Sequence, residues 1–504
     1  MGDAPLRIGV AGTGLMGRGI AQVATQAGFE CLLYDSRAGI ADAAKEDIAA
    51  QLRRLAEKGK LDAKEATQAA ARLKPVPGLA ELAACGIVIE AIVEDLEAKR
   101  ELFHALERVV TPDCILASNT SSLPVTAIAA ACARPERVAG MHFFSPVPLM
   151  KVVEVIDGVR TGPGVAQRLL ELGRAFGHTA VRAKDTPGFL VNHAGRAYGT
   201  EALRILSEGV AEFHVIDDVL REAAGFRMGP FELLDLTGLD VSQPVMESIY
   251  HQFYEEPRFR PSPLLVQRRL GGLLGRKSGR GFYAYADGVR QPIEREAPPP
   301  PARPLVWVSR ADAAVHGRVE ALAAKLGACI DSGARPAPDA ICVLSPWGTD
   351  ATSASLAEEL DARRCVAIDA WFGWESRRTL MGTPVTDPAV RDAARGLFAA
   401  DGVPVSWIHD CPGFIAPRVV AQIVNVACDI AQQRIAAPAD IDRAVTLGLG
   451  YRQGPLAMGD AVGPARVLEM LSALLSFYGD PRYRPSPWLT RRARLGVPLA
   501  TPEN

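Results

Sequence analysis

Short apolar runs alternate with helical patterns along the first 150 residues. Runs at 8–12, 30–35, 86–92, 114–120 and 138–144 have the length and the branched side chains of buried strands. A helix is predicted from about Met16 to Ala27, and a long polar helix after residue 35. This alternation predicts a doubly wound, parallel sheet with helices on both faces.

The pattern changes near Asp185. From there to about Arg269 the apolar spacing is helical and few strand-like runs occur, which predicts a helical second domain. The stretch EREAPPPPARP at 294–304 contains four consecutive prolines, which favour a stiff, extended conformation. We expect the main linker there.

An internal repeat relates the two halves of the chain. DTPGFLVN at 185–192 returns as DCPGFIAP at 410–417, and AGFRMGPFELLDLTG at 224–238 returns as LGYRQGPLAMGDAVG at 449–463. Both are shifted by 225 residues, and PRFRPSP at 257–263 returns as PRYRPSP at 481–487. The helical domain is therefore duplicated.

We interpret the intervening region as a degenerate copy of the first sheet domain, because it too alternates strand-like and helical segments. The prediction is an α/β plus α protein: a sheet domain (1–184), a helical domain (185–290), a Pro-rich linker (291–304), a degenerate sheet domain (305–409) and a second helical domain (410–504).

Composition narrows the classes of partner. Lys plus Arg number 56 against 58 Asp plus Glu, so we expect no nucleic acid and no membrane surface as partner. The nine cysteines form no CxxC pair, which is typical of reduced thiols, and no apolar stretch of about 18 residues occurs. We expect a soluble, cytoplasmic protein without a metal site.

A glycine-rich loop follows the first predicted strand. Gly12-Thr13-Gly14-Leu15-Met16-Gly17 is a GxGxxG sequence that opens a helix, and Asp35 ends the next strand. These features predict a Rossmann domain that binds NAD, because a carboxylate accepts from the ribose hydroxyls and repels a 2′-phosphate. Arg37 is the residue that would favour NADP, and a purely structural glycine turn is the alternative.

A histidine and a glutamate supply candidate acid/base chemistry. His142 falls at the carboxyl end of a predicted strand, where open α/β sheets bind ligands. Glu154 interrupts the apolar run VVEVI, where a carboxylate needs a partner, and one imidazole nitrogen would suffice. His142 is then the base that removes a hydroxyl proton. A satisfied core histidine with a snorkelling glutamate remains the alternative.

Seven segments in order resemble the motifs of the L-3-hydroxyacyl-CoA dehydrogenases. They are GTGLMGRGIAQVA, EAIVEDLEAKRELF, SNTSSLPVTAIA, GMHFFSPVPLMKVVEVI, DTPGFLVN, GFRMGPFELLDLTGLD and GRKSGRGFY, and they cover about residues 6–285. The resemblance implies NAD as cofactor, a helical domain that forms the dimer interface, and a (3S)-3-hydroxyacyl-CoA bound between the two domains.

The resemblance also implies roles for single residues. His142 and Glu154 match the catalytic pair, and Ser121 and Asn192 match residues around the reacting end of the substrate. The implied NAD contacts are Gly12, Gly14, Leu15, Met16, Gly17, Asp35, Glu94, Lys99, Asn119, Ser121, Ser145 and Lys277. Without the resemblance, Ser121 is a turn residue, Asn192 a helix cap, and Glu94 with Lys99 a solvated ion pair.

Two positions depart from the family pattern. Separately, one basic stretch offers candidate contacts to coenzyme A. Ser145 stands where the family usually has Asn, and His193 where it often has Arg. Arg54, Lys58 and Lys60, within QLRRLAEKGKLDAKE at 51–65, are candidates for the phosphates of coenzyme A, with a solvated helix face as the alternative.

The second half lacks the catalytic residues. CVAIDAWF at 365–372 puts Ala370 at the position of His142, Pro417 replaces Asn192, and no glycine-rich loop follows LVWV. We predict that residues 304–504 bind no NAD and act as an internal stand-in for a partner subunit or as a wall of the acyl pocket; a homodimer is the alternative. The two-copy layout resembles the long bacterial 3-hydroxyadipyl-CoA and 3-hydroxybutyryl-CoA dehydrogenases, the former of phenylacetate catabolism.

Two other functions remain open. A dehydrogenase of free hydroxy acids or imines would share the nucleotide motif without the GRKSGRGFY and GPFELLD segments. A non-catalytic, crystallin-like NAD-binding protein would not need His142, Glu154, Ser121 and Asn192 together, and all four are present.

Overall fold

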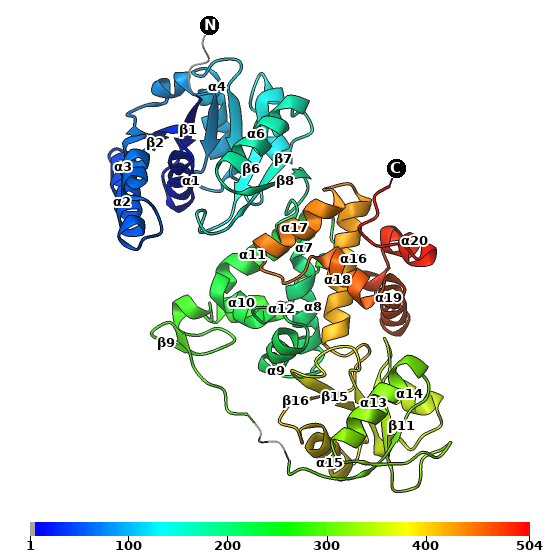
Figure 1. The fold of residues 1–504 in the computed structure, drawn as a ribbon. Coiled ribbons are helices and arrows are strands. Elements are labelled where there is room, and N and C mark those ends of the chain that lie inside the picture. Colours follow the sequence, from blue (N-terminus) through cyan, green and yellow to red (C-terminus); the bar gives the residue numbers. More distant parts are fainter. Residues whose placement is uncertain (1–5, 296, 298, 504) are drawn as a thin grey trace. The chain divides into compact units, whose positions relative to one another are not determined.

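The structure is a computed structural model that describes residues 6–295, 297 and 299–503 (Figure 1). The chain forms two compact units. The first runs to His193 and includes Gln433–Leu449, and the second comprises Ala194–Gln432 and Gly450–Asn504. The described residues of the predicted linker form no helix or strand, and its positions 296 and 298 lie outside the described residues.

An eight-stranded sheet forms the centre of the first unit, in the order β3-β2-β1-β4-β5-β6-β7-β8. Its strands are β1 (Arg7–Ala11), β2 (Glu30–Tyr34), β3 (Leu73–Pro75), β4 (Ile87–Glu90), β5 (Ile115–Ser118), β6 (Val138–Phe143), β7 (Val152–Asp157) and β8 (Thr179–Lys184). The predicted parallel, doubly wound sheet is confirmed for β1 to β6. Beyond the predicted strands, β7 runs antiparallel to β6, and β8 follows the direction of β7.

Helices α1 (Leu15–Gln26), α2 (Ile40–Glu57), α3 (Ala63–Ala71), α4 (Leu96–Glu107), α5 (Val125–Ala129) and α6 (Pro163–Ala175) accompany this sheet. The predicted long polar helix after residue 35 is in fact the pair α2 and α3, which lie side by side (Figure 1). Gly59 adopts a φ of +66°, and the Asp62 carboxylate accepts from the amides of Lys64 and Glu65, so the chain turns and a new helix begins.

Helices dominate residues 185–269 and 410–504, as predicted. The first set is α7 (Val191–Ala194), α8 (Arg196–Ser207), α9 (Phe213–Asp218), α10 (Pro230–Thr237), α11 (Leu239–Gln252) and α12 (Pro263–Leu270), and a two-stranded ribbon, β9 (Tyr285–Ala286) and β10 (Val289–Arg290), follows. The second set is α16 (Ala416–Gln432), α17 (Pro438–Gly448), α18 (Pro455–Val462), α19 (Pro464–Tyr478) and α20 (Pro487–Leu495). None of the described helices is long and apolar enough for a membrane span.

A six-stranded sheet in the second unit has the order β12-β11-β13-β14-β15-β16. Its strands are β11 (Leu305–Val308), β12 (Cys329–Ile330), β13 (Ile341–Leu344), β14 (Cys365–Ile368), β15 (Arg378–Gly382) and β16 (Val405–Ile408), with helices α13 (Ala313–Lys325), α14 (Ala351–Ala357) and α15 (Pro388–Phe398). Strand β15 runs antiparallel to β14. The second sheet thus repeats the reversal at β7.

Equivalent hydrogen bonds show which elements the second sheet has lost. The Asp185 carboxylate accepts from the first amides of α5, at Val125 and Thr126. Asp410, 225 residues on, does the same for α14, through Ala351 and Thr352. Helix α14 is therefore the counterpart of α5 and β13 that of β5, so among the described residues of the second copy β4 and α4 have no counterpart.

The repeats also exchange backbone hydrogen bonds. The Lys184 amide donates to the Ile435 carbonyl at 2.9 Å, within the first unit. The His409 amide donates to the Val210 carbonyl at 2.9 Å, within the second. Both donors and acceptors are related by the 225-residue shift, so the end of each sheet domain bonds to a helical segment of the other repeat.

Candidate active site

His142 and Glu154 form a buried pair at one end of the first sheet. His142 on β6 lies directly opposite Glu154 on β7 in the antiparallel ladder. Its Nδ1 is 2.6 Å from Glu154 Oε2, and their side chains are 6% and 0% exposed. The reversal of β7 makes this pairing, because residues directly opposite in antiparallel strands project to the same face.

Glu154 has more partners than the sequence argument required. Its Oε1 accepts from the amides of Leu190 at 3.0 Å and Val191 at 2.8 Å, at the start of α7. With three donors around it the carboxylate remains an acceptor, so the hydrogen-bond network assigns the imidazole proton to His142 Nδ1 and the lone pair to Nε2. The same carboxylate holds the segment that carries Asn192.

The glycine-rich loop fits a dinucleotide. Gly12 has a φ of +95°, and a Cβ there would lie 2.6 Å from the Ala91 carbonyl oxygen; a Cβ on Gly17 would lie 1.9 Å from the Gly12 carbonyl oxygen. A Cβ on Gly14 would meet no atom within 4 Å. Gly12 and Gly17 thus permit the turn, while Gly14 leaves open space above the first turn of α1, formed by Leu15 and Met16, where helix amides attract phosphate.

Asp35 follows β2 as predicted. Its carboxylate accepts from the amide and hydroxyl of Thr13, both at 3.1 Å, and from the amide and Nε of Arg37 at 3.1 and 3.2 Å. Burial raises the pKa of Asp35, but these hydrogen bonds outweigh it and hold that pKa below its usual value. Arg37, the residue that favoured NADP in the sequence, pairs with Asp35.

Lys99 and Glu94 belong to a buried network rather than to a solvated pair. The Lys99 ammonium, 1% exposed, lies 2.5 Å from Glu90 Oε1 and 3.3 Å from Glu94 Oε2. Glu94 Oε1 accepts from the Ser121 amide at 2.8 Å and from the hydroxyl groups of Thr120 and Ser121. Although burial raises the pKa of Glu94, Lys99 and these donors bring it below its usual value. The network fixes the loop that carries Ser121.

Glu90 and Ser118 complete this network, and sequence reasoning missed both. Glu90 is fully buried and accepts from the Ile92 amide at 2.7 Å and from the Ser118 hydroxyl at 2.6 Å. The signal was present, because Glu90 interrupts the apolar run GIVIEAI just as Glu154 interrupts VVEVI. A carboxylate in such a run requires buried partners.

The remaining residues predicted to contact NAD or coenzyme A are distributed over both units. Asn119 Oδ1 accepts from the Phe143 amide at 2.8 Å and so joins the ends of β5 and β6. Ser145, Leu15 and Arg54 line a cavity of about 300 Å³, whereas Lys58 and Lys60 lie exposed in the turn after α2. The predicted basic helix at 51–65 is therefore broken there. In the second unit, the Lys277 ammonium pairs with Asp240 at 2.6 Å.

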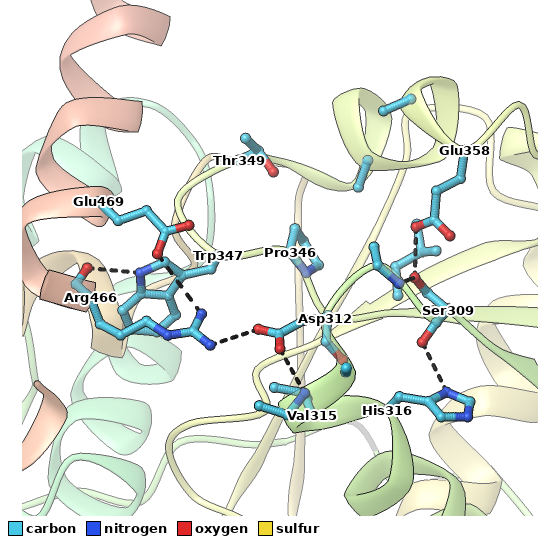
Figure 2. Close-up of a pocket in the computed structure, with 17 residues that line it drawn as sticks. Ser309, Asp312, Val315, His316, Pro346, Trp347, Thr349, Glu358, Arg466 and Glu469 are labelled. Carbon is cyan, nitrogen blue, oxygen red and sulfur yellow. Dashed lines mark hydrogen bonds and ion pairs between the residues drawn. The ribbon is translucent and has the colours of Figure 1, made fainter.

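The second sheet has a cavity of about 550 Å³ at the carboxyl ends of β11 and β13 (Figure 2). Asp312 caps the N-terminus of α13 in this cavity, at the position that Gly14 has before α1 in the first copy. The Asp312 carboxylate accepts from the Ala314 amide at 3.0 Å and pairs with Arg466 at 2.9 Å. Figure 2 shows Ser309 likewise bonded to Glu358, at 2.7 Å. A carboxylate of the chain itself thus occupies the helix terminus that attracts phosphate in the first copy.

The second sheet also lacks a counterpart of the His142–Glu154 pair. Ile368 lies opposite Leu380, and the same register continued places Arg378 opposite Ala370. Arg378 pairs with Asp401 at 2.7 Å. The neighbouring Asp369 is buried, and this burial raises its pKa to about 7 despite hydrogen bonds from two backbone amides. Nothing at this position reproduces a histidine and a carboxylate.

Comparisons with known proteins agree with this geometry. The family model described as "3-hydroxyacyl-CoA dehydrogenase, NAD binding domain" matches residues 7–186, and its "C-terminal domain" partner matches residues 188–285 and again 413–499. The second match coincides with the repeat found in the sequence.

Similar proteins include relatives that match nearly the whole chain and relatives that match about half of it. A curated Escherichia coli K12 protein named 3-hydroxyadipyl-CoA dehydrogenase is 39% identical over 97% of each chain. The human mitochondrial hydroxyacyl-coenzyme A dehydrogenase is 40% identical over 55% of this chain and 90% of its own. A crystal structure described as 3-hydroxybutyryl-CoA dehydrogenase from Escherichia coli K12 superposes with a TM-score of 0.84 and 38% identity, covering 98% of this chain and 99% of that one.

Proposed function

The chain belongs to the 3-hydroxyacyl-CoA dehydrogenase family, and we propose that it interconverts a (3S)-3-hydroxyacyl-CoA and the 3-oxoacyl-CoA with His142 as the acid/base. The observation that carries this assignment is the buried His142–Glu154 pair, 2.6 Å apart, in the domain that has the dinucleotide loop. NAD is the cofactor, and when bound it would supply the acceptor for the hydride that leaves C3.

The residues of the chain supply proton transfer and orientation. His142 Nε2 removes the proton of the 3-hydroxyl group, and Glu154 stabilises the imidazolium that forms. In the reverse direction the imidazolium returns the proton to the 3-oxygen. Ser121 and Asn192 hold the substrate oxygens, and Glu94 and Glu154 position the segments that carry them.

The proposed cofactor contacts begin at the open space beside Gly14 in the glycine-rich loop. Gly14 with the first turn of α1 receives the pyrophosphate, and Asp35 accepts from the ribose hydroxyls. We assign Glu94, Asn119, Ser145 and Lys277 to the nicotinamide half. Lys99 acts through Glu94, because its ammonium is buried between two carboxylates.

For coenzyme A we propose contacts on α2 and the turn after it. Arg54 lines the 300 Å³ cavity beside Ser145, and Lys58 and Lys60 are exposed nearby along the chain. Both 3-hydroxyadipyl-CoA and 3-hydroxybutyryl-CoA are candidate substrates, since similar long proteins carry these two names. We infer that the second repeat binds no NAD and stands in for a partner subunit.

The test is NADH oxidation with acetoacetyl-CoA, 3-oxoadipyl-CoA and free acetoacetate, for the wild type and His142→Ala side by side. We expect activity on the thioesters only, and a fall in kcat of about 10²–10⁴-fold in the variant with NADH affinity unchanged. Titration with NADH should give one site per chain. An absence of wild-type activity on both thioesters, despite tight NADH binding, would refute the proposal.

A further inference from the structure

Glu90 is a fully buried carboxylate at the end of β4, in the first unit. It belongs to neither the proposed substrate contacts nor the proposed cofactor contacts. Its Oε1 accepts from the Lys99 ammonium at 2.5 Å and from the Ile92 amide at 2.7 Å, and its Oε2 accepts from the Ser118 hydroxyl at 2.6 Å. A carboxylate inside an apolar sheet requires such donors. Two of them lead from Glu90 to the same loop.

The first connection runs through Ser118, the last residue of β5. Residues 119–122, called here the serine loop, follow it directly. Ser118 donates to Glu90, and its oxygen accepts from the Thr120 amide at 3.2 Å. The Asn119 amide donates to the Glu90 backbone carbonyl at 2.8 Å. Glu90 therefore holds the start of the serine loop through both its side chain and its backbone.

The second connection runs through Lys99 and Glu94. The Lys99 ammonium lies between Glu90 Oε1 at 2.5 Å and Glu94 Oε2 at 3.3 Å, and its side chain is 1% exposed. The other oxygen of Glu94 accepts from donors of the serine loop, namely the amides of Ser121 and Ser122 and the hydroxyl groups of Thr120, Ser121 and Ser122, at 2.7 to 3.3 Å. One carboxylate oxygen thus fixes most of the loop.

Charge, as well as shape, joins these two carboxylates. A buried ammonium is stable only beside counter-charges, and its attraction to them is strong where water is excluded. If Glu90 were neutral, Glu94 would be the one carboxylate left within 4 Å of Lys99 among the described residues. The ammonium would then be drawn toward Glu94, and any shift of Glu94 disturbs its bonds to the serine loop. The position of the loop therefore depends on a charge that lies outside it.

We propose that Glu90 is a positioning residue, whose negative charge acts through Lys99 and Glu94 to hold the serine loop in place for the substrate and for the nicotinamide half of NAD. This inference rests on the proposed function, which assigns Ser121 to the substrate and Glu94 to the cofactor. It adds a residue that contacts neither ligand and acts on both.

The experiment uses Glu90→Gln, which keeps the size of the side chain and removes its charge. Fluorescence titration gives the Kd of NADH, and steady-state kinetics with acetoacetyl-CoA give KM and kcat. We expect Kd and KM to rise roughly 10- to 100-fold, with a smaller fall in kcat because the proposed base is untouched. Glu90→Asp, which retains the charge, should recover part of both constants. Glu97→Gln, at a side chain of α4 that is 72% exposed, is the matched control and should change neither.

A double variant tests the path of the effect. Glu90→Gln/Lys99→Met removes both charges, so no buried ammonium is left without its main partner. If Glu90 acts through Lys99, the two substitutions are not additive, and the double variant should bind NADH within threefold of Glu90→Gln. Losses that multiply would show that the two residues act independently and would overturn the proposal.

Thermal unfolding separates positioning from stability. A folded Glu90→Gln protein with a lower unfolding midpoint but with Kd and KM within threefold of the wild type has lost only stability, and this result overturns the inference. If Glu90→Gln does not fold, the double variant is judged by the same threshold against the wild type. The proposed function fails separately: weakened NADH binding in Glu90→Gln, together with a wild type inactive on thioesters, supports the positioning role and refutes the function alone.

Discussion

At the scale of single residues, Glu154 combines two tasks in one carboxylate. One oxygen fixes the His142 imidazole, and the other accepts from the amides of Leu190 and Val191 just before Asn192. Because the proposed base and the proposed substrate-binding segment share this partner, we expect a change at Glu154 to disturb both proton transfer and orientation.

We predict that Glu154→Gln lowers kcat by about 10²–10⁴-fold. The amide oxygen of glutamine can still accept from the two backbone amides, but its NH₂ group then faces His142 Nδ1 and favours the tautomer with the proton on Nε2. The imidazole loses the lone pair that the reaction needs. Steady-state kinetics with saturating acetoacetyl-CoA and NADH measure this loss.

Asp157→Asn supplies the control, since Asp157 lies on the same strand and pairs with the half-exposed Arg182. Its kcat should remain within threefold of the wild type. A Glu154→Gln enzyme that retained more than a tenth of the wild-type kcat would show that the carboxylate does not set the tautomer.

At the scale of elements, α8 and α16 pack together through a buried arginine. Arg418 on α16 is fully buried, and its guanidinium lies 2.6 Å from Glu201 and 2.8 Å from Glu208, both contributed by the first repeat. The Tyr483 hydroxyl is a further partner at 2.8 Å. The repeat places His193 at the position equivalent to Arg418, so the two copies do not make this ion pair twice.

We predict that Arg418→Met destabilises the protein by about 3–5 kcal/mol, because it removes a buried counter-charge from Glu201 and leaves Arg482, 3.4 Å away, as its remaining cation. Urea unfolding followed by circular dichroism measures the change. Arg443→Ala removes a largely exposed pair with Asp440 and should cost less than about 0.5 kcal/mol. Equal unfolding midpoints for Arg418→Met and the wild type would contradict the prediction.

At the scale of the whole molecule, the two repeats depend on each other for complete cores. The first unit includes α17, a helix of the second repeat, and Lys184 bonds to the Ile435 carbonyl just before it. His409 bonds to Val210 in the equivalent way. This reciprocal arrangement supports the proposal that the second half replaces a partner subunit.

We predict that a chain ending at Ala297 unfolds more than about 10 °C below the full protein and loses activity as a monomer, because it lacks α17 and leaves the contact face of α8 uncovered. Differential scanning calorimetry and size-exclusion chromatography test both statements. A monomeric truncated chain with full stability and full activity would refute the stand-in role.

Much of this architecture could be read from local patterns. The apolar runs predicted β1, β2, β4, β5 and β6, and the 225-residue shift predicted the second helical set. The reversal of β7 could not be predicted, since VVEVI fits a strand of either direction. Likewise, the polar pattern after residue 35 does not show that Gly59 and Asp62 divide one helix into two.

The sequence by itself determined the family, the dinucleotide loop and the identity of the His142–Glu154 pair, because each depends on residue types at fixed spacing. Only the tertiary structure revealed the three partners of Glu154 and the burial of Lys99 between Glu90 and Glu94. These features join segments far apart in the chain, and their energies depend on burial and approach, which spacing along a sequence does not encode.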